Sequence, residues 1–190
     1  MNKVKTGLII GGIILIAVGV FFTTIGKQIT APTTLKEYSN SEHSISFKYS
    51  DAYYLEEKEV GNGERTHHFI SLTEDTEENK QVREGTAPPR EGPTAITVDI
   101  FQNNLDGLSV DQWVTGTNDS NFKLSPDGTI TTLTVGEKEA LSYRWSGLYE
   151  GKSVVIATPE FVYMFSVSYL TPEDTILRDF DALLATVNIQ

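Results

Sequence analysis

Few side chains in this 190-residue chain could do chemistry, and histidine is the scarcest of them. There are three histidines and no cysteine, so disulfides, thiolate metal sites and cysteine nucleophiles are excluded. His67 and His68 are adjacent in a predicted strand, where successive side chains point to opposite faces. We therefore expect that they do not chelate one metal ion. With His43 far away in the sequence, we predict structural or surface roles for all three, and neither a metal site nor a cofactor.

One catalytic motif does occur, the S-x-x-K pattern at Ser120 to Lys123. In penicillin-binding proteins this serine works together with S-D-N and K-T-G motifs. Here the surrounding residues are typical of a loop, whereas the motif requires its serine at the start of a helix. The K-T-G at Lys5 to Gly7 lies on the other side of a predicted membrane segment. We interpret the match as coincidence, and the sequence contains no H-E-x-x-H, P-loop, G-x-S-x-G or dinucleotide-binding pattern.

The chain is acidic, with 26 acidic and 15 basic residues and a net charge of −11. This balance argues against nucleic-acid binding, because binding to phosphates needs clustered Lys and Arg. Two carboxylate-based functions stay open as alternatives: a cell-envelope hydrolase with a pair of catalytic acids, and a module that responds to divalent cations. No spacing selects the residues for either, so the main hypothesis is a binding or accessory protein without enzymatic activity.

Residues 73–93 stand out by length and composition, with six acidic residues, three basic residues and three prolines between two predicted strands. Structureless connections longer than about 12–15 residues are uncommon in compact domains and are usually functional or disordered. We hypothesise a partner-docking or cation-attracting loop, and mobile decoration explains the composition at least as well. The charged residues that would make the docking contacts are Glu74, Asp75, Glu77, Glu78, Arg83 and Arg90.

Two aromatic groups also have two interpretations. Tyr53-Tyr54 and the Trp145/Tyr149 pair could line a groove for a peptide or a glycan. Alternating aromatic residues in strands more often pack in the core or across strands, and we favour this second interpretation.

The N-terminal region predicts how the chain is placed in a membrane. Residues 7–26 contain no charged residue and, as a helix, would span the ~30 Å hydrocarbon layer. Lys3 and Lys5 precede them, so the positive-inside rule places residues 1–6 in the cytoplasm. A cleaved signal peptide is the alternative, but the apolar run is longer than a typical h-region and no convincing A-x-A site follows. We predict a single-pass signal anchor in the cell membrane, a tether at residues 27–36 and an extracytoplasmic domain at residues 37–190.

The predicted partners are the lipid bilayer, through residues 7–26, and an unidentified envelope protein. Gly7 and Gly11 form a G-x-x-x-G pair that would let two helices approach closely. This pair predicts a weak homodimer, although chance is the simpler explanation in a segment so rich in glycine. The part of the chain after Lys27 holds 12 basic and all 26 acidic residues, a formal charge of −14, which repels an anionic bilayer surface.

The elements that must position these residues are mainly strands. Alternating apolar and polar residues predict strands at 44–49, 66–72, 94–102, 130–135, 138–149, 153–157 and 161–169. Turns at Glu150-Gly151 and at residues 158–160 would join the last three into an antiparallel meander. A capping box of Ser109 and Gln112 predicts one short helix, and Thr171-Pro172 predicts the start of another. The expected fold is α+β: an N-terminal transmembrane helix, then a mainly antiparallel sheet with packed helices.

Short segments along residues 38–190 carry a family resemblance. They are Tyr38–Asn40, Ser44–Tyr49, Leu108–Trp113, Val135–Ala140, Phe161–Tyr169, Thr171–Asp174 and Leu184–Val187. Their order resembles that of the PsbP-like superfamily, which includes an extrinsic subunit of photosystem II and a Ran-binding nuclear import factor. Ser50 departs from the pattern, since proline typically follows the aromatic strand.

This resemblance implies an α/β/α sandwich and an accessory or binding role, and membrane-anchored bacterial members of the superfamily are known. The photosynthetic and nuclear roles do not transfer, because none of the matched residues carries either role.

Overall fold

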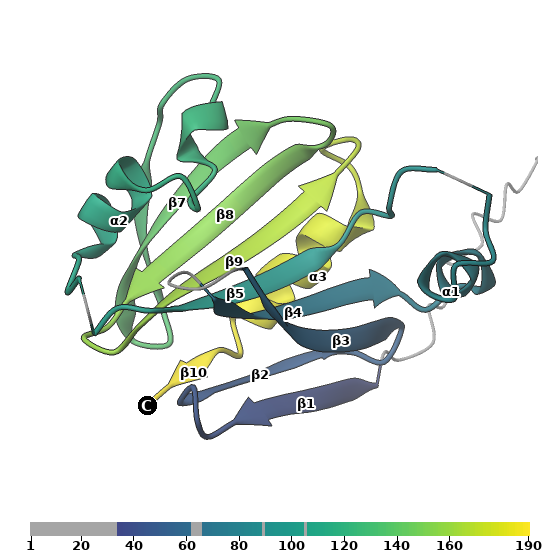
Figure 1. The fold of residues 1–190 in the computed structure, drawn as a ribbon, viewed down its shortest axis with the longest axis horizontal. Helices are drawn as coiled ribbons and strands as arrows, with labels where there is room; N and C mark the ends of the chain where they lie inside the picture. The colour runs from purple at the N-terminus through teal and green to yellow at the C-terminus, as the bar shows by residue number, and fades with distance from the viewer. Residues whose placement is uncertain (1–33, 62–65, 89, 105) are drawn as a thin grey trace, which may run out of the picture. The chain divides into compact units, whose positions relative to one another are not determined.

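A computed structural model describes residues 34–61, 66–88, 90–104 and 106–190 of the chain (Figure 1). The predicted membrane segment at residues 7–26, with Gly7 and Gly11, lies outside the described residues, as does most of the predicted tether. Within the described ranges, no helix has the length and apolar character needed to cross a membrane.

Strands of the described region form two sheets whose pairings are antiparallel. The smaller sheet has the order β1 (Leu35–Asn40), β2 (Ile45–Ser50), β10 (Asn188–Ile189). The larger has the order β3 (Tyr53–Val60), β4 (His67–Glu74), β5 (Ile96–Gln102), β9 (Phe161–Tyr169), β8 (Glu150–Ala157), β7 (Lys138–Ser146), β6 (Thr131–Val135).

The main core lies on one face of the larger sheet. Ile96, Val98 and Ile100 alternate along β5 and are at most 2% exposed, as the period of two predicts. Helix α3 (Thr175–Leu184) covers this face with a buried stripe that includes Phe180 and Leu183. The smaller sheet contributes Phe47 to the same cluster, so a mainly antiparallel α+β domain is confirmed.

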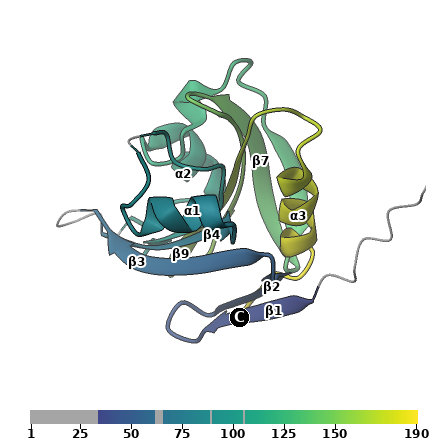
Figure 2. The same cartoon turned by 90° about the vertical axis from the view of Figure 1, so that its right-hand side faces the viewer.

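Two short helices lie on the opposite side of the larger sheet from α3 (Figure 2). Helix α1 spans Glu77–Arg83 and α2 spans Val110–Gly116. The predicted capping box is present, because the Ser109 side chain accepts from the Gln112 amide and the Gln112 side chain accepts from the Ser109 amide. A second apolar cluster around Trp113 and Val114 lies beneath α2, and a 3-10 turn, η2 (Phe122–Leu124), follows.

Two predicted boundaries are wrong. Glu150-Gly151 is not a turn, because both residues pair with β7 and β9 inside β8. The last helix begins at Thr175 and not at Thr171-Pro172, because the Asp174 carboxylate accepts from the backbone amides of Leu170 and Thr171 and closes a turn there. This alternative partner for the backbone is the usual way in which Asp competes with helix formation.

Five elements of the described region lie where no strand or helix was predicted, and they include the 3-10 turn η2 and the short strand β10. Strand β1 includes Leu35 and Lys36, which were assigned to the tether, and its register with β2 is set by the pair Leu35↔Ser50. Strand β3 pairs along its whole length with β4 although its outer half is polar and exposed. Helix α1 replaces part of the expected structureless connection at residues 73–93.

Candidate functional site

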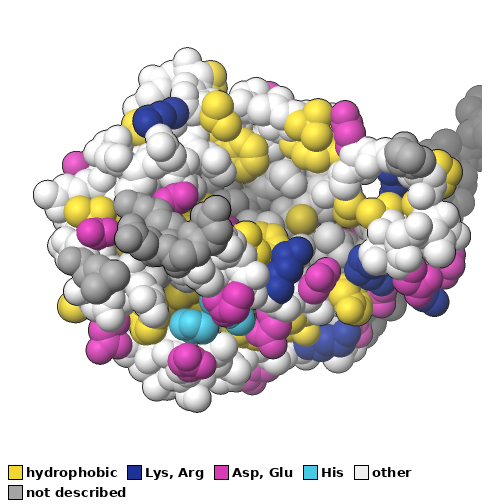
Figure 3. Space-filling model, in the orientation of Figure 1, with side chains coloured by type: hydrophobic (Ala, Val, Ile, Leu, Met, Phe, Trp, Pro, Cys, Tyr) yellow, Lys and Arg dark blue, Asp and Glu magenta, His cyan; other side chains and the backbone are white. Residues whose placement is uncertain are grey.

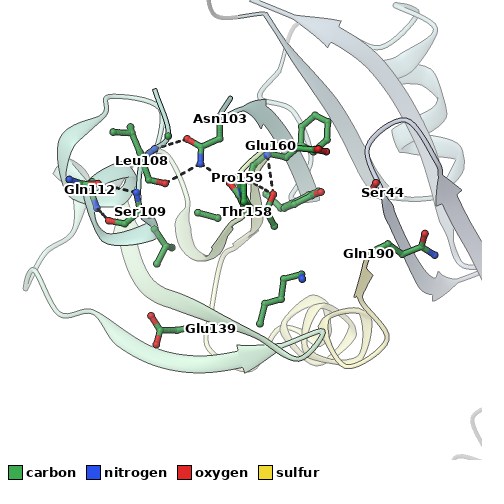
Figure 4. Close-up of a pocket in the computed structure, with 16 residues that line it drawn as sticks. Ser44, Asn103, Leu108, Ser109, Gln112, Glu139, Thr158, Pro159, Glu160 and Gln190 are labelled. Atoms are coloured by element: carbon green, nitrogen blue, oxygen red, sulfur yellow. Dashed lines mark hydrogen bonds between the residues drawn. The ribbon is translucent and has the colours of Figure 1, made fainter. Parts of the chain in front are cut away.

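A large hollow lined by described residues lies at one end of the larger sheet, and we call it the end pocket. Its volume is about 940 Å³, in the range of small-ligand sites. The loop and first turn of α2 (residues 107–112) form one side, and Ser44 and Gln190 lie on the other (Figure 4). The β8–β9 turn at residues 158–160 lies between them, and Glu139 of β7 faces the remaining side.

Asn103 holds two of these walls together. Its side chain is 3% exposed and donates to the backbone oxygens of Leu108 at 3.0 Å and Thr158 at 2.7 Å. Its amide oxygen accepts from the Leu108 N–H at 2.9 Å. Because breaking these bonds would leave buried polar groups unsatisfied, they hold the loop before α2 against the β8–β9 turn.

The lining of the end pocket is chemically mixed. Lys138, Glu139 and Glu160 carry charges of both signs, and Leu108 and Val110 contribute half-buried apolar surface. Tyr163 lies at the floor, where burial raises the pKa of its phenol to about 12, and its hydroxyl donates to the His43 carbonyl at 2.8 Å. An open, mixed and well-ordered hollow of this kind suits a polypeptide segment with both polar and apolar side chains.

Sequence reasoning missed the end pocket completely. Its walls come from segments that lie more than a hundred residues apart in the chain, between Ser44 and Gln190. None of these segments carries a motif, so only the tertiary structure brings them together. The one local signal was Asn103 directly after an apolar strand, where a buried amide often closes a turn.

The segment predicted to dock a partner contains the end of strand β4 and the whole of helix α1. Glu74 ends β4, Glu77 and Glu78 lie in the first turn of α1, and Thr76 caps the helix by accepting from the Asn79 amide. Carboxylates in a first turn favour helix formation through the helix dipole. The expectation of a structureless connection is therefore wrong for residues 74–83.

Both arginines of that segment have partners inside it. Arg83 donates to Asp75 at 2.8 Å and lies 4.0 Å above the Tyr54 ring, while Arg90 pairs with Glu78. Glu74, Glu78 and Arg90 also line a second hollow of about 750 Å³, together with Tyr149 and the exposed Leu170. We call this hollow the α1 pocket, and docking at it stays a prediction.

Two of the three histidines, His43 and His68, lie against each other although they are far apart in the sequence. His67 and His68 point to opposite faces as predicted: His67 pairs with Asp99 at 3.0 Å, and His68 contacts Glu57 and Glu59 on the other face. The distant His43 stacks on His68 with ring centroids 4.6 Å apart. Burial and the His68 charge lower the pKa of His43. Among the described residues, no group of three or more ligating side chains could hold a metal ion.

The S-x-x-K serine has a structural role. Ser120 is fully buried and donates to the Val114 carbonyl at 2.7 Å, and its own carbonyl accepts from the Tyr143 hydroxyl. It lies before a 3-10 turn and not at the start of an α-helix, so the interpretation of the motif as a coincidence agrees with the structure.

Two carboxylates of the described residues have a shifted acidity, and in both the shift is downward. Backbone amides lower the pKa of Asp127 and of Asp174. A catalytic acid would need a raised pKa inside a pocket.

Comparison with known proteins places the fold. No model of a known protein family matches the chain, and no curated protein matches it. Among solved structures, the chain is similar to cyanobacterial PsbP (CyanoP) from Synechocystis sp. PCC 6803, with a TM-score of 0.54 and 11% sequence identity over 86% of this chain and 96% of that one. It also matches a Bacteroides thetaiotaomicron crystal structure, with a TM-score of 0.45 and 9% identity over 82% of this chain and 48% of that one. The sequence resemblance is thus confirmed at the level of architecture, and the described domain has a PsbP-like fold.

Proposed function

We propose that this protein is a membrane-anchored, extracytoplasmic accessory protein without enzymatic activity, and that its PsbP-like domain binds a segment of an envelope protein in the end pocket. The observation that supports this proposal best is the end pocket. It combines a volume of about 940 Å³ with walls held by the buried Asn103, so that binding a partner costs little conformational entropy.

The chemistry of the lining favours a polypeptide over a single charged metabolite. Lys138 could pair with an acidic side chain of a partner, and Glu139 and Glu160 could pair with basic ones. Leu108 and Val110 offer apolar contact. A partner segment with alternating charged and apolar residues matches this surface. The PsbP-like fold supports an accessory role, and the apolar segment at residues 7–26 supports the anchor.

Site-specific photo-cross-linking of the full chain in its native membranes tests the proposal. A photoreactive amino acid replaces Gln112 in the end pocket, Asn79 in the α1 pocket, or Leu124, which is 50% exposed and lines neither pocket. We expect one adduct of constant mass from Gln112 and none from Leu124.

The other outcomes are decisive too. An adduct from Asn79 alone would move the docking site to the α1 pocket and reject the end pocket. Equal yields from all three positions, or no adduct at any of them, would reject docking by this domain. If Gln112 does give the adduct, Glu160→Lys, which reverses an exposed charge of the lining, should reduce its yield.

A further inference from the structure

The two sheets of the described region end in the edge strands β1, β10, β3 and β6. An edge strand offers unpaired backbone N–H and C=O groups to other chains, and charged side chains or a very short strand protect it. β1 carries Lys36 and Glu37, β3 carries four charged residues at 56–59, and β10 has only two residues. Acidic and basic side chains also gather over β3, β4 and α1 (Figure 3). Three of these edges are therefore protected.

The fourth edge, β6, has none of these protections. Thr131–Val135 and the preceding Ile130 contain no charged residue and no proline, and five of these six residues are β-branched. The side chains of Thr131, Thr132 and Thr134 are exposed. Among the described residues, β7 is the strand that pairs with β6, and no other described backbone group bonds to it. Every second residue of β6 therefore directs its N–H and C=O away from the sheet.

The side chains of β6 differ between the two faces of the sheet. Leu133 and Val135 pack with the main core cluster, whereas Thr132 and Thr134 lie on the opposite face because successive side chains alternate. A strand added at this edge must continue both faces, with apolar side chains on the first and polar ones on the second. A second copy of β6 has this pattern. When two copies run antiparallel about a two-fold axis perpendicular to the sheet, each face meets its own kind.

Continuity of the faces also restricts the register of such a pair. A shift by one residue would bring the threonine row of one copy beside the apolar row of the other. The register in which all five residues of β6 overlap places Leu133 opposite Leu133 of the second copy. Thr132 then lies opposite Thr134 twice, and Thr–Thr pairs across strands stabilise a sheet.

The charges around β6 permit this association. β6 itself carries no charge. Opposite it on β7 lie Lys138 and Glu139, which have opposite signs, and Arg144 lies 3.6 Å from Asp127. Two whole domains repel each other, because the chain after Lys27 has a formal charge of −14. Salt screens this repulsion beyond about 8 Å at physiological ionic strength, whereas hydrogen bonds between two uncharged strands are not weakened.

We propose that two copies of this chain associate through β6, as an antiparallel strand pair that joins their larger sheets into one. The strand is only five residues long, so the interface is small and the dimer is of the weak, reversible class. β6 contributes no residue to the lining of the end pocket. The dimer is therefore independent of the proposed function, and either one can fail without the other.

Cysteine cross-linking of the full chain in its native membranes tests the pairing and its register. The chain has no cysteine, so each substitution reports on one position, and a disulfide needs Cα atoms within about 7 Å. Leu133→Cys should give a disulfide-linked dimer. Thr132→Cys and Thr134→Cys should each give little alone but should link to each other when co-expressed. Gln81→Cys, exposed on α1, is the control and should give none.

Charge exchange tests the same pairing in the purified full chain in non-ionic detergent. Thr132→Lys with Thr134→Lys places lysine opposite lysine twice, so the dissociation constant measured by sedimentation should rise about tenfold. The corresponding double Glu variant should behave alike, and an equimolar mixture of the two should associate again. Gln81→Lys with Asn104→Lys adds the same charge away from β6 and should leave association unchanged. Raising the salt concentration should strengthen the parent dimer.

Several results would overturn the proposal. They are the absence of any disulfide from the β6 cysteines, yields no higher than from Gln81→Cys, and cross-links to a different protein only. A dimer that persists unchanged in the double Lys variant would be held elsewhere, for example by Gly7 and Gly11. A dimer that weakens as salt is added would be held by charged groups, and β6 has none.

Discussion

At the scale of the residue, His43 lies in the turn between β1 and β2, and its ring contacts side chains of the larger sheet. Its ring lies between His68 of β4, 4.6 Å away, and Phe161 of β9, 5.5 Å away. Its Nδ1 atom is buried and has no hydrogen-bond partner among the described residues. Burial and the nearby His68 lower the pKa of His43, and the carboxylates Glu42, Glu59 and Glu57 only partly oppose this.

The lowered pKa predicts how stability depends on pH. Below about pH 6.5 the unfolded chain binds a proton at His43 more readily than the folded chain does, so acidification favours unfolding. The stability that the neutral His43 contributes is fully present above about pH 6.5. It is lost as the pH falls through the pKa that His43 has in the folded chain. His43→Phe keeps a ring in the same place and removes the titration. Urea unfolding at pH 5 and pH 7.5 should show a smaller acid-induced loss in the variant, and equal losses would contradict this account.

At the scale of the element, α1 shows why a charged segment can be ordered without a core. The helix buries no residue, yet Thr76 caps it, acids occupy its first turn and Arg83 lies in its last turn. Arg83 is the contact that ties the helix to the sheet, because it both pairs with Asp75 and stacks over Tyr54. A guanidinium that is only 18% exposed contributes more than a surface ion pair usually does.

Replacing Arg83 should therefore loosen α1 locally. Arg83→Met is expected to cost about 1 kcal/mol through loss of the cation–π contact and the ion pair. Amide exchange across residues 75–84 should become faster, while exchange in β5 and β9 stays slow, because α1 lies outside both core clusters. Lys80→Met in the same helix is the matched control, since Lys80 is exposed and changes charge equally. Similar exchange in both variants would show that Arg83 does not hold the helix.

At the scale of the whole molecule, the chain consists of an apolar, uncharged segment near its N-terminus and a long acidic remainder. Residues 7–26 carry no charge, whereas the chain after Lys27 has a formal charge of −14. Under the proposed function, residues 7–26 are the segment expected to partition into a bilayer, and the acidic remainder is expected to be repelled by anionic lipid. The proposed anchor therefore acts through this one segment.

A single charge in that segment tests the anchor. Ile16→Arg places a guanidinium at the centre of the run, which costs about 2.5–3.5 kcal/mol of insertion free energy on translocon scales. We expect the parent chain to stay in the membrane fraction after carbonate extraction and the variant to be released in substantial part. Ile16→Val is the control and should behave like the parent. Release of the parent chain would reject anchoring by residues 7–26.

The sequence by itself determined the class of fold and most of its strands. Periods of two in β5 and β9 and the capping box of α2 are local signals, because the alternation and the cap depend on neighbours within a few residues. The opposite orientation of His67 and His68 follows from the same rule. Local signals were insufficient for β3 and for the edge of β1, since a half-exposed strand owes its existence to the neighbour that pairs with it.

Tertiary structure alone decided where ligands could bind. The end pocket gathers segments from Ser44 to Gln190. Strand register brings such distant segments side by side, and register is a relation between strands that no local signal contains. Trp145 illustrates the difference: its sequence position predicts a packed aromatic residue, and only the cross-strand pairing shows that its indole lies against Gly151.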